Sequence, residues 1–187
     1  MSKNLKLSAL VFLLSIPFLL PAQRYFSRNA NVSFDATTNS SLETIAAKTS
    51  AGTMVVDAPT GKVEAAVLMK GFQFEKALMQ EHFNENYVES SKYPKAVFKG
   101  KIVDASKLDF SKDGTYNVQL SGDLTMHGIT KQVAAPAVFN IKNGKVSGQT
   151  DFSVALNDFG ISVPSLVSDK LAKEAKVTFG GDLEPMK

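Results

Sequence analysis

One long run of alternating residues limits what this chain can fold into. From Tyr116 to Met126 every second side chain is apolar or glycine, and those between are Asn, Gln, Ser, Asp and Thr. A period of two places successive side chains on opposite faces of a β-strand. Such a strand would be about 36 Å long at ~3.3 Å per residue, which is typical of a curled barrel rather than a sandwich. Gly122, in its middle, predicts a bend or a bulge.

A second constraint is Asn143-Gly144, which predicts a two-residue type I′ hairpin because both residues tolerate positive φ. This turn sets the register of the two flanking strands and gives both of them one apolar face. Pro136 cannot donate to a ladder, so we expect an edge or a bulge there. The expected facing pairs are Ile141 with Val146, Phe139 with Gly148, Ala135 with Phe152, and Val133 with Val154.

Further alternating segments and turn signals run through the chain without a linker or a fixed repeat, which predicts one domain. A helix is predicted from Phe74 to Asn86, and a second short one from Ser165 to Lys173. The expected fold class is therefore all-β: an antiparallel, extended β-barrel of about eight strands with one or two short helices. The other predicted strands lie around residues 32–34, 63–69, 96–102 and 175–179.

The first 22 residues have the pattern of a secretory signal peptide. Lys3 and Lys6 precede an apolar run over residues 7–20, and Ala22 is the expected last residue removed. A membrane anchor is the alternative, but Pro17 interrupts a run already short of the ~20 residues that a span needs. Residues 23–187 would then form the mature domain, and no cysteine is present for a lipid anchor. Loss of the two lysines lowers the formal net charge from +3 to +1, which argues against nucleic-acid binding.

Residue types that support catalysis or metal binding are sparse. His82 and His127 are the only histidines, there is no cysteine, and no metal-ligand spacing, nucleophile elbow or phosphate loop occurs. Asp158 and Asp169 are interpreted as turn and cap residues. We therefore expect no enzyme, no metal and no cofactor. An enzyme acting on an amphiphile is the alternative, and it would require His127 to face the interior beside a carboxylate.

The inward face of the predicted strands is the candidate ligand site. Its large side chains alternate with Ala and Gly, which leaves room for a ligand, and a barrel of about eight strands can hold one small molecule. A barrel filled by its own side chains explains the same pattern and remains the alternative. The candidate ligand-binding residues are Phe98, Ile102, Val118, Leu120, Leu124, Met126, Phe139, Ile141, Phe152 and Val154.

Three motifs, in order, resemble the YceI-like family: Tyr93-Pro94-Lys95-Ala96-Val97-Phe98, Leu124-Thr125-Met126-His127-Gly128-Ile129-Thr130-Lys131 and Asp158-Phe159-Gly160-Ile161. The resemblance covers roughly residues 31–183. It implies a lipocalin-like barrel in the bacterial periplasm or beyond, with an isoprenoid quinone, a polyprenyl chain or a related lipid inside. The barrel mouth would involve Leu78, Phe83, His127 and Phe159.

The expected function is therefore that of an exported protein that carries or sequesters an apolar lipid. Buried hydrocarbon contributes roughly 0.8 kcal/mol per CH₂, so a dry interior is a sufficient binding mechanism. His127 would either contact a lipid head group or simply form a turn with Gly128. The sequence leaves a monomer and a homodimer as alternatives, and the homodimer would form if an open edge near Pro136 or along the last strand paired with a second copy.

Overall fold

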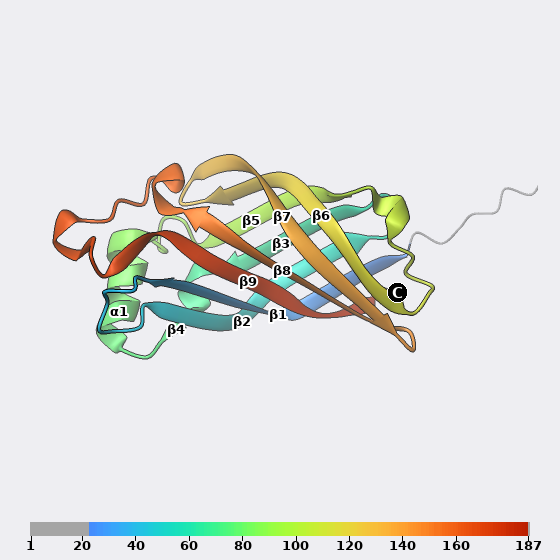
Figure 1. Ribbon diagram of the computed structural model, residues 1–187, viewed down its shortest axis with the longest axis horizontal. Helices are drawn as coiled ribbons and strands as arrows, with labels where there is room; N and C mark the ends of the chain where they lie inside the picture. Colours follow the sequence, from blue (N-terminus) through green and yellow to red (C-terminus); the bar gives the residue numbers. More distant parts are fainter. Residues whose placement is uncertain (1–22, 187) are drawn as a thin grey trace, which may run out of the picture.

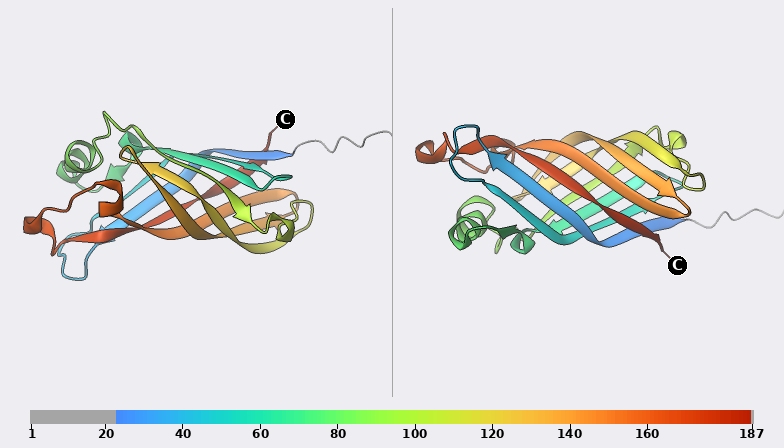
Figure 2. Two further views of the ribbon diagram at one scale, coloured as in Figure 1. Left: turned by 90° about the horizontal axis from the view of Figure 1, so that it is seen from above. Right: turned by 60° about the horizontal axis from the view of Figure 1, so that its bottom comes forward.

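Eight long antiparallel strands close into a barrel in the computed structural model, which describes residues 23–186 (Figures 1 and 2). The strand order is β1-β9-β8-β7-β6-β5-β3-β2, and β2 pairs with β1 to close the sheet. A two-residue strand, β4 (Gln73–Phe74), adds to β2. The long strands are β1 (Arg24–Thr37), β2 (Ala46–Asp57), β3 (Lys62–Leu68), β5 (Lys95–Val103), β6 (Gly114–Met126), β7 (Ile129–Lys142), β8 (Lys145–Ala155) and β9 (Leu171–Pro185).

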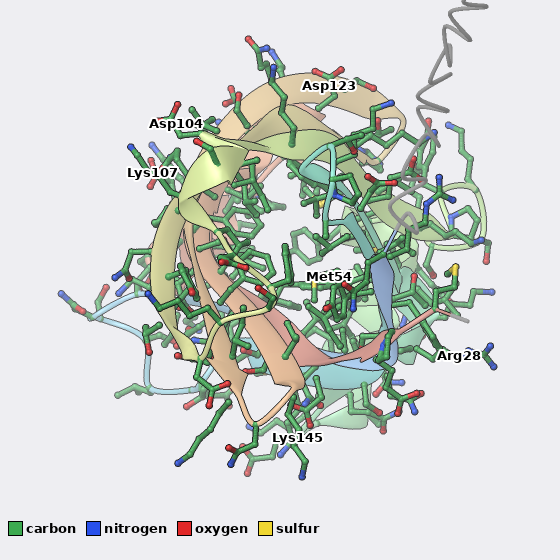
Figure 3. All side chains as sticks on the ribbon, turned by 90° about the vertical axis from the view of Figure 1, so that its right-hand side faces the viewer. Arg28, Met54, Asp104, Lys107, Asp123 and Lys145 are labelled. Atoms are coloured by element: carbon green, nitrogen blue, oxygen red, sulfur yellow. The ribbon has the colours of Figure 1, made fainter. Side chains whose placement is uncertain are left out.

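The two ends of the barrel differ. One, here called the helix end, carries α1 (Ala77–His82), the β1–β2 loop (residues 38–45) and the β8–β9 loop (residues 156–170). The other, here called the closed end, carries the β7–β8 hairpin, the β5–β6 connection and the C-terminus (Figure 1). Viewed from the closed end, charged side chains such as Asp123 and Lys145 project outward while Met54 lies inside (Figure 3).

Helical structure is shorter than the sequence predicts. The segment expected to be one helix from Phe74 to Asn86 is α1 followed by a π-helical turn, η2 (Phe83–Tyr87). The second predicted helix is only the 3₁₀ turn η5 (Ser165–Val167), because β9 already begins at Leu171, which pairs with Thr37 of β1. The remaining 3₁₀ turns are η1 (Met69–Gly71), η3 (Ala105–Lys107) and η4 (Leu156–Phe159).

The β7–β8 hairpin has the predicted turn. Asn143 and Gly144 adopt φ values of 51° and 74°, and the ladder begins as expected with Ile141 opposite Val146 and Phe139 opposite Gly148. It ends at Ala137 opposite Thr150, so the expected pairs Ala135–Phe152 and Val133–Val154 do not form. Pro136 is the reason, since it has no N–H to offer β8. Its carbonyl instead accepts a hydrogen bond from the Thr150 hydroxyl at 2.7 Å.

The glycine in the middle of β6 has a role other than the predicted bulge. Gly122 pairs in regular register with Gly100 of β5. A Cβ atom added at Gly122 would lie 2.4 Å from the Gly100 Cα atom and 2.4 Å from the Lys99 carbonyl oxygen. Glycine is therefore required here for close approach of two strands.

The β2–β3 turn at the closed end is held by one carboxylate. Asp57 accepts hydrogen bonds from the Thr60 hydroxyl at 2.6 Å and from the Arg24 Nε atom at 3.0 Å. The bond from Thr60, and then that from Arg24, holds the pKa of the Asp57 carboxyl below its usual 3.8. The ionised carboxyl therefore stabilises this turn.

The sheet leaves few edges for a second copy. β9 lies between β8 and β1, so the last strand is not an open edge. Beside Pro136, the unpaired parts of β7 and β8 belong to neighbouring strands of one barrel. The edge pairing that motivated a homodimer is thus absent at the last strand, and dimerisation itself stays a prediction.

Candidate ligand-binding cavity

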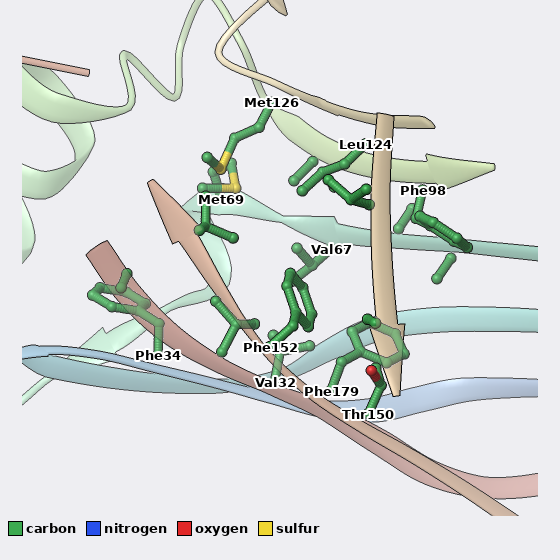
Figure 4. A pocket seen from close by; sticks show the side chains of 18 of the residues that line it. Val32, Phe34, Val67, Met69, Phe98, Leu124, Met126, Thr150, Phe152 and Phe179 are labelled. Carbon is green, nitrogen blue, oxygen red and sulfur yellow. The ribbon is translucent and has the colours of Figure 1, made fainter. Parts of the chain in front are cut away.

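An apolar cavity extends from the middle of the barrel to the helix end (Figure 4). Its volume is about 160 Å³, and all eight long strands contribute side chains to its wall. The close-up shows Phe152 and Phe179 on one side and Leu124 and Phe98 on the other. The period of two in each strand produces this wall, because alternate side chains point inward.

Polar groups are almost absent from the cavity wall. Of the lining residues, only Thr150 has a hydroxyl, amide or charged side chain, and its hydroxyl already donates to the Pro136 carbonyl. A ligand group that needed a hydrogen bond would lose its water here without compensation. The cavity therefore suits hydrocarbon.

The free space is small for a long chain. A cavity of roughly 150 Å³ lined by Leu, Ile and Phe side chains in another protein accepts benzene, so this one holds about six carbon atoms. Phe98, Phe152 and Phe179 are only half-buried and their rings lie against the space. A longer chain would need these rings to rotate, so the barrel is neither fully hollow nor fully filled.

Four phenylalanine rings cover the helix end of the cavity. Phe34 of β1 stacks on Phe83 of η2 with ring centroids 5.3 Å apart, and Phe72 and Phe74 pack edge-on against Phe34 at 5.4 and 5.6 Å. Such pairs stabilise by about 0.5–1.5 kcal/mol beyond the area they bury. Sequence reasoning missed Phe34, Phe72 and Phe74 as site residues, although the i,i+2 spacing of the last two was a signal.

Six of the ten residues predicted to contact ligand line the cavity, and four do not. Ile102, Val118, Phe139 and Ile141 point inward but belong to a packed cluster at the closed end. There Tyr25 stacks on Phe110 at 4.8 Å, and Phe110 lies 6.1 Å from Phe139. The β5–β6 connection supplies Phe110 and fills this half. The six lining residues are Phe98, Leu120, Leu124, Met126, Phe152 and Val154.

The residues predicted at the barrel mouth take different places. Phe83 lines the cavity, whereas Leu78 is 61% exposed and points away from it. Phe159 is buried in the cluster around the cavity without lining it. Three of the predicted mouth residues lie in α1, η2 and η4 at the helix end, and His127, in the β6–β7 turn, contacts the Phe159 carbonyl there.

His127 joins two segments at the helix end. Its Nδ1 atom lies 2.9 Å from the carbonyl oxygen of Phe159, and its Nε2 atom lies 3.0 Å from a carboxyl oxygen of Glu89. The Tyr93 ring packs against the imidazole edge at 4.7 Å, and a Cβ at Gly128 would lie 2.6 Å from this ring. The imidazole thus has the neighbouring carboxylate that the enzyme alternative needs, but it does not line the cavity.

Within residues 23–186, no group of three or more His, Asp or Glu side chains is placed to hold a metal ion. No helix in that part of the chain has the length and apolar character to cross a membrane.

A family model described as a YceI-like domain matches residues 26–181. The chain belongs to the YceI family. A UPF0312 protein of Pseudomonas putida is 33% identical to it over 98 residues, or 49% of the chain and 47% of that protein. Another from Pseudomonas syringae is 32% identical over 104 residues, covering 52% and 50%. The chain thus aligns with about half the length of these curated relatives.

Solved structures show the same fold. A polyisoprenoid-binding domain from Saccharophagus degradans superposes with a TM-score of 0.73 at 10% identity, covering 87% of this YceI-family chain and 98% of that domain. BcnA of Burkholderia cenocepacia gives a TM-score of 0.66 at 13% identity, covering 83% and 96%. The predicted all-β barrel and the family resemblance are thereby confirmed.

Proposed function

We propose that this YceI-family protein is an exported lipid-binding protein that sequesters or carries an apolar, polyisoprenoid-like amphiphile in its barrel. One observation carries the proposal. The cavity wall offers no free hydrogen-bonding side chain, because the hydroxyl of Thr150 is already bonded. Only the hydrocarbon part of an amphiphile is compatible with such a wall.

Binding energy follows from burial alone. Each buried CH₂ contributes about 0.8 kcal/mol, so six carbons in the free space would supply roughly 5 kcal/mol before the costs of association. Rotation of Phe98, Phe152 and Phe179 would admit more of the chain. The neighbour from Saccharophagus degradans, named as a polyisoprenoid-binding domain, supports this class of ligand.

The polar head of the amphiphile would lie at the helix end, since the closed end is filled around Tyr25, Phe110 and Phe139. Export to the periplasm or the medium is part of the proposal. It rests on the signal peptide expected over residues 1–22, which lie outside the described residues. The absence of a catalytic group on the cavity wall supports binding rather than turnover.

The test is purification of the mature chain, from Gln23 onward, out of a bacterial periplasm without detergent. Native mass spectrometry followed by lipid extraction should show one discrete adduct with an apolar chain. A clean apo mass, together with failure of farnesol or a longer prenol to bind on titration, would reject the proposal. That result would favour a structural barrel, for which the packed closed end is the supporting observation.

A further inference from the structure

The most exposed large apolar side chains gather at the helix end. Among residues 23–186, Leu42 is fully exposed, Leu166 is 91% exposed and Leu78 is 61% exposed, whereas the next, Met186, reaches only 46%. These three leucines lie on the β1–β2 loop, the β8–β9 loop and α1, which protrude together from the helix end (Figures 1 and 2). Isolated surface leucines are ordinary, but a group confined to one end indicates an interaction surface.

The three segments are joined to one another. The hydroxyls of Thr38 and Ser40 in the β1–β2 loop both donate to the Asp169 carbonyl of the β8–β9 loop, the second at 2.8 Å. On the other side, the Lys76 ammonium at the start of α1 lies 2.6 Å from the Glu43 carboxylate. The β1–β2 loop thus contacts both of the other segments, and the three leucines that the segments carry are here called the leucine rim (Leu42, Leu78 and Leu166).

The leucine rim lies beside the cavity cover. β1 runs through Phe34 directly into the β1–β2 loop, and α1 runs directly into η2 with Phe83. Phe34 and Phe83 are the stacked pair of the cover. A surface that contacted the rim would therefore lie next to the phenylalanine rings that cover the cavity at the helix end.

The composition of the β1–β2 loop, α1 and the β8–β9 loop indicates what kind of surface would contact the leucine rim. Leu42 follows two serines, and Leu166 lies in the uncharged stretch Ser165 to Ser168. Residues 38–45, 75–82 and 156–170 together hold five carboxylates and two lysines, so an anionic surface would be repelled. Separate leucines on protruding loops suit the interface of a bilayer, which needs no matching shape. These features fit a zwitterionic lipid surface.

We propose that the helix end docks reversibly on a zwitterionic lipid bilayer by inserting Leu42, Leu78 and Leu166 into the interface. This inference rests on the proposed function for its purpose, because docking would place the cavity cover against the source of the lipid. Docking itself does not require a bound ligand. The rim leucines, and not the lysines, supply the attraction, so binding should not fall as salt is added.

The experiment is flotation of the mature protein with vesicles of phosphatidylcholine and phosphatidylethanolamine. Leu42→Ser, Leu78→Ser and Leu166→Ser should each weaken partitioning about fivefold, and the triple variant about a hundredfold, because each removes one inserted apolar side chain. Val103→Ser, at the closed end, is the matched control and should leave partitioning unchanged. Vesicles containing phosphatidylglycerol should bind more weakly at low salt.

Vesicle binding that persists in the triple variant, or that is absent from the wild-type protein, overturns the proposal. A wild-type dimer that the triple substitution dissociates would also overturn it, by showing that a second copy covers the rim. Native mass spectrometry separates this test from that of lipid binding. A triple variant that keeps its lipid adduct but no longer floats supports docking. A wild-type protein that floats but neither carries an adduct nor binds a prenol on titration supports docking while rejecting the carrier function.

Discussion

Filling the cavity should weaken binding without harming the fold, and Ala135→Leu tests this. Ala135 lines the cavity from β7, and it belongs to none of the packed clusters, so its methyl group faces free space. Leucine adds three carbon atoms to a space that holds about six. The ligand then loses room for about three carbons, or about 2.4 kcal/mol at 0.8 kcal/mol per CH₂, which corresponds to about sixtyfold weaker binding.

The free energy of unfolding should move in the opposite direction or stay constant. Filling a void adds contacts and buried area, which is favourable as long as the new side chain is not strained. We expect a gain between zero and about 2 kcal/mol. Most large substitutions that weaken binding also destabilise, so the combination of weaker binding and an equal or higher stability is diagnostic of cavity filling.

The assay is titration of the fluorescent apolar probe N-phenyl-1-naphthylamine, with denaturant unfolding on the same samples. Ala134→Leu is the matched control, since this residue is adjacent on β7 but exposed on the outer face. It should bind the probe like the wild-type protein. If Ala135→Leu folds normally and binds with unchanged affinity, the probe does not occupy the cavity and the assignment of the site is refuted.

Three further predictions concern the cavity wall, the strand contact and the closed-end turn. Leu124→Arg should abolish probe binding or destabilise the fold by more than about 3 kcal/mol, because it buries an unpaired charge. Asp123→Arg, on the outer face, should do neither. If the two variants had the same probe affinity and the same stability, the inward assignment of Leu124 would be contradicted. Gly122→Ala should cost about 3 kcal/mol in urea unfolding, because a methyl group cannot fit against Gly100 without moving a strand, and a loss below about 0.5 kcal/mol would show that the strands separate freely. Asp57→Asn should lower the melting temperature at neutral pH but not in strong acid. Because the folded-state pKa of Asp57 is lowered, its carboxylate stabilises the fold above pH 3.8, and this contribution is lost as the pH falls through the folded-state pKa. A difference in melting temperature that stayed constant at all pH values would argue against this role of the Asp57 carboxylate.

The features that the sequence predicted correctly are those that depend on residues close together in the chain. Alternation gave the inward faces of β6, β7 and β8, and Asn143-Gly144 gave the turn and the start of the register, because both depend on neighbours in sequence. The six cavity residues among ten followed from the same period. What failed depends on contacts between distant segments: Phe110 fills the closed end from a connection with no regular pattern, and so removes Ile102, Val118, Phe139 and Ile141 from the cavity wall.

Single glycine and proline residues predicted where a strand would be irregular but not what form the irregularity would take. Gly122 was compatible with a bulge, a bend or a close approach, and only its partner Gly100 on the neighbouring strand decides among them. Pro136 indicated an interruption without saying how far it would extend. Leu78 has helical spacing with His82, yet α1 has no buried residue, because the cover is made by Phe83 in the turn that follows.

The early end of the β7–β8 ladder leaves an unpaired seam in the barrel. Beyond Ala137 and Thr150 the two strands run toward the helix end without pairing to each other, and this stretch borders Ala135, Phe152 and Val154 of the cavity wall. Along the regular ladders of the barrel, widening would break a row of backbone hydrogen bonds. Along the seam no ladder pair joins β7 to β8, and beyond it the His127 contact with the Phe159 carbonyl links the β6–β7 turn to the segment after β8. If a ligand longer than the cavity of about 160 Å³ enters the barrel, we expect the wall to move first along this seam.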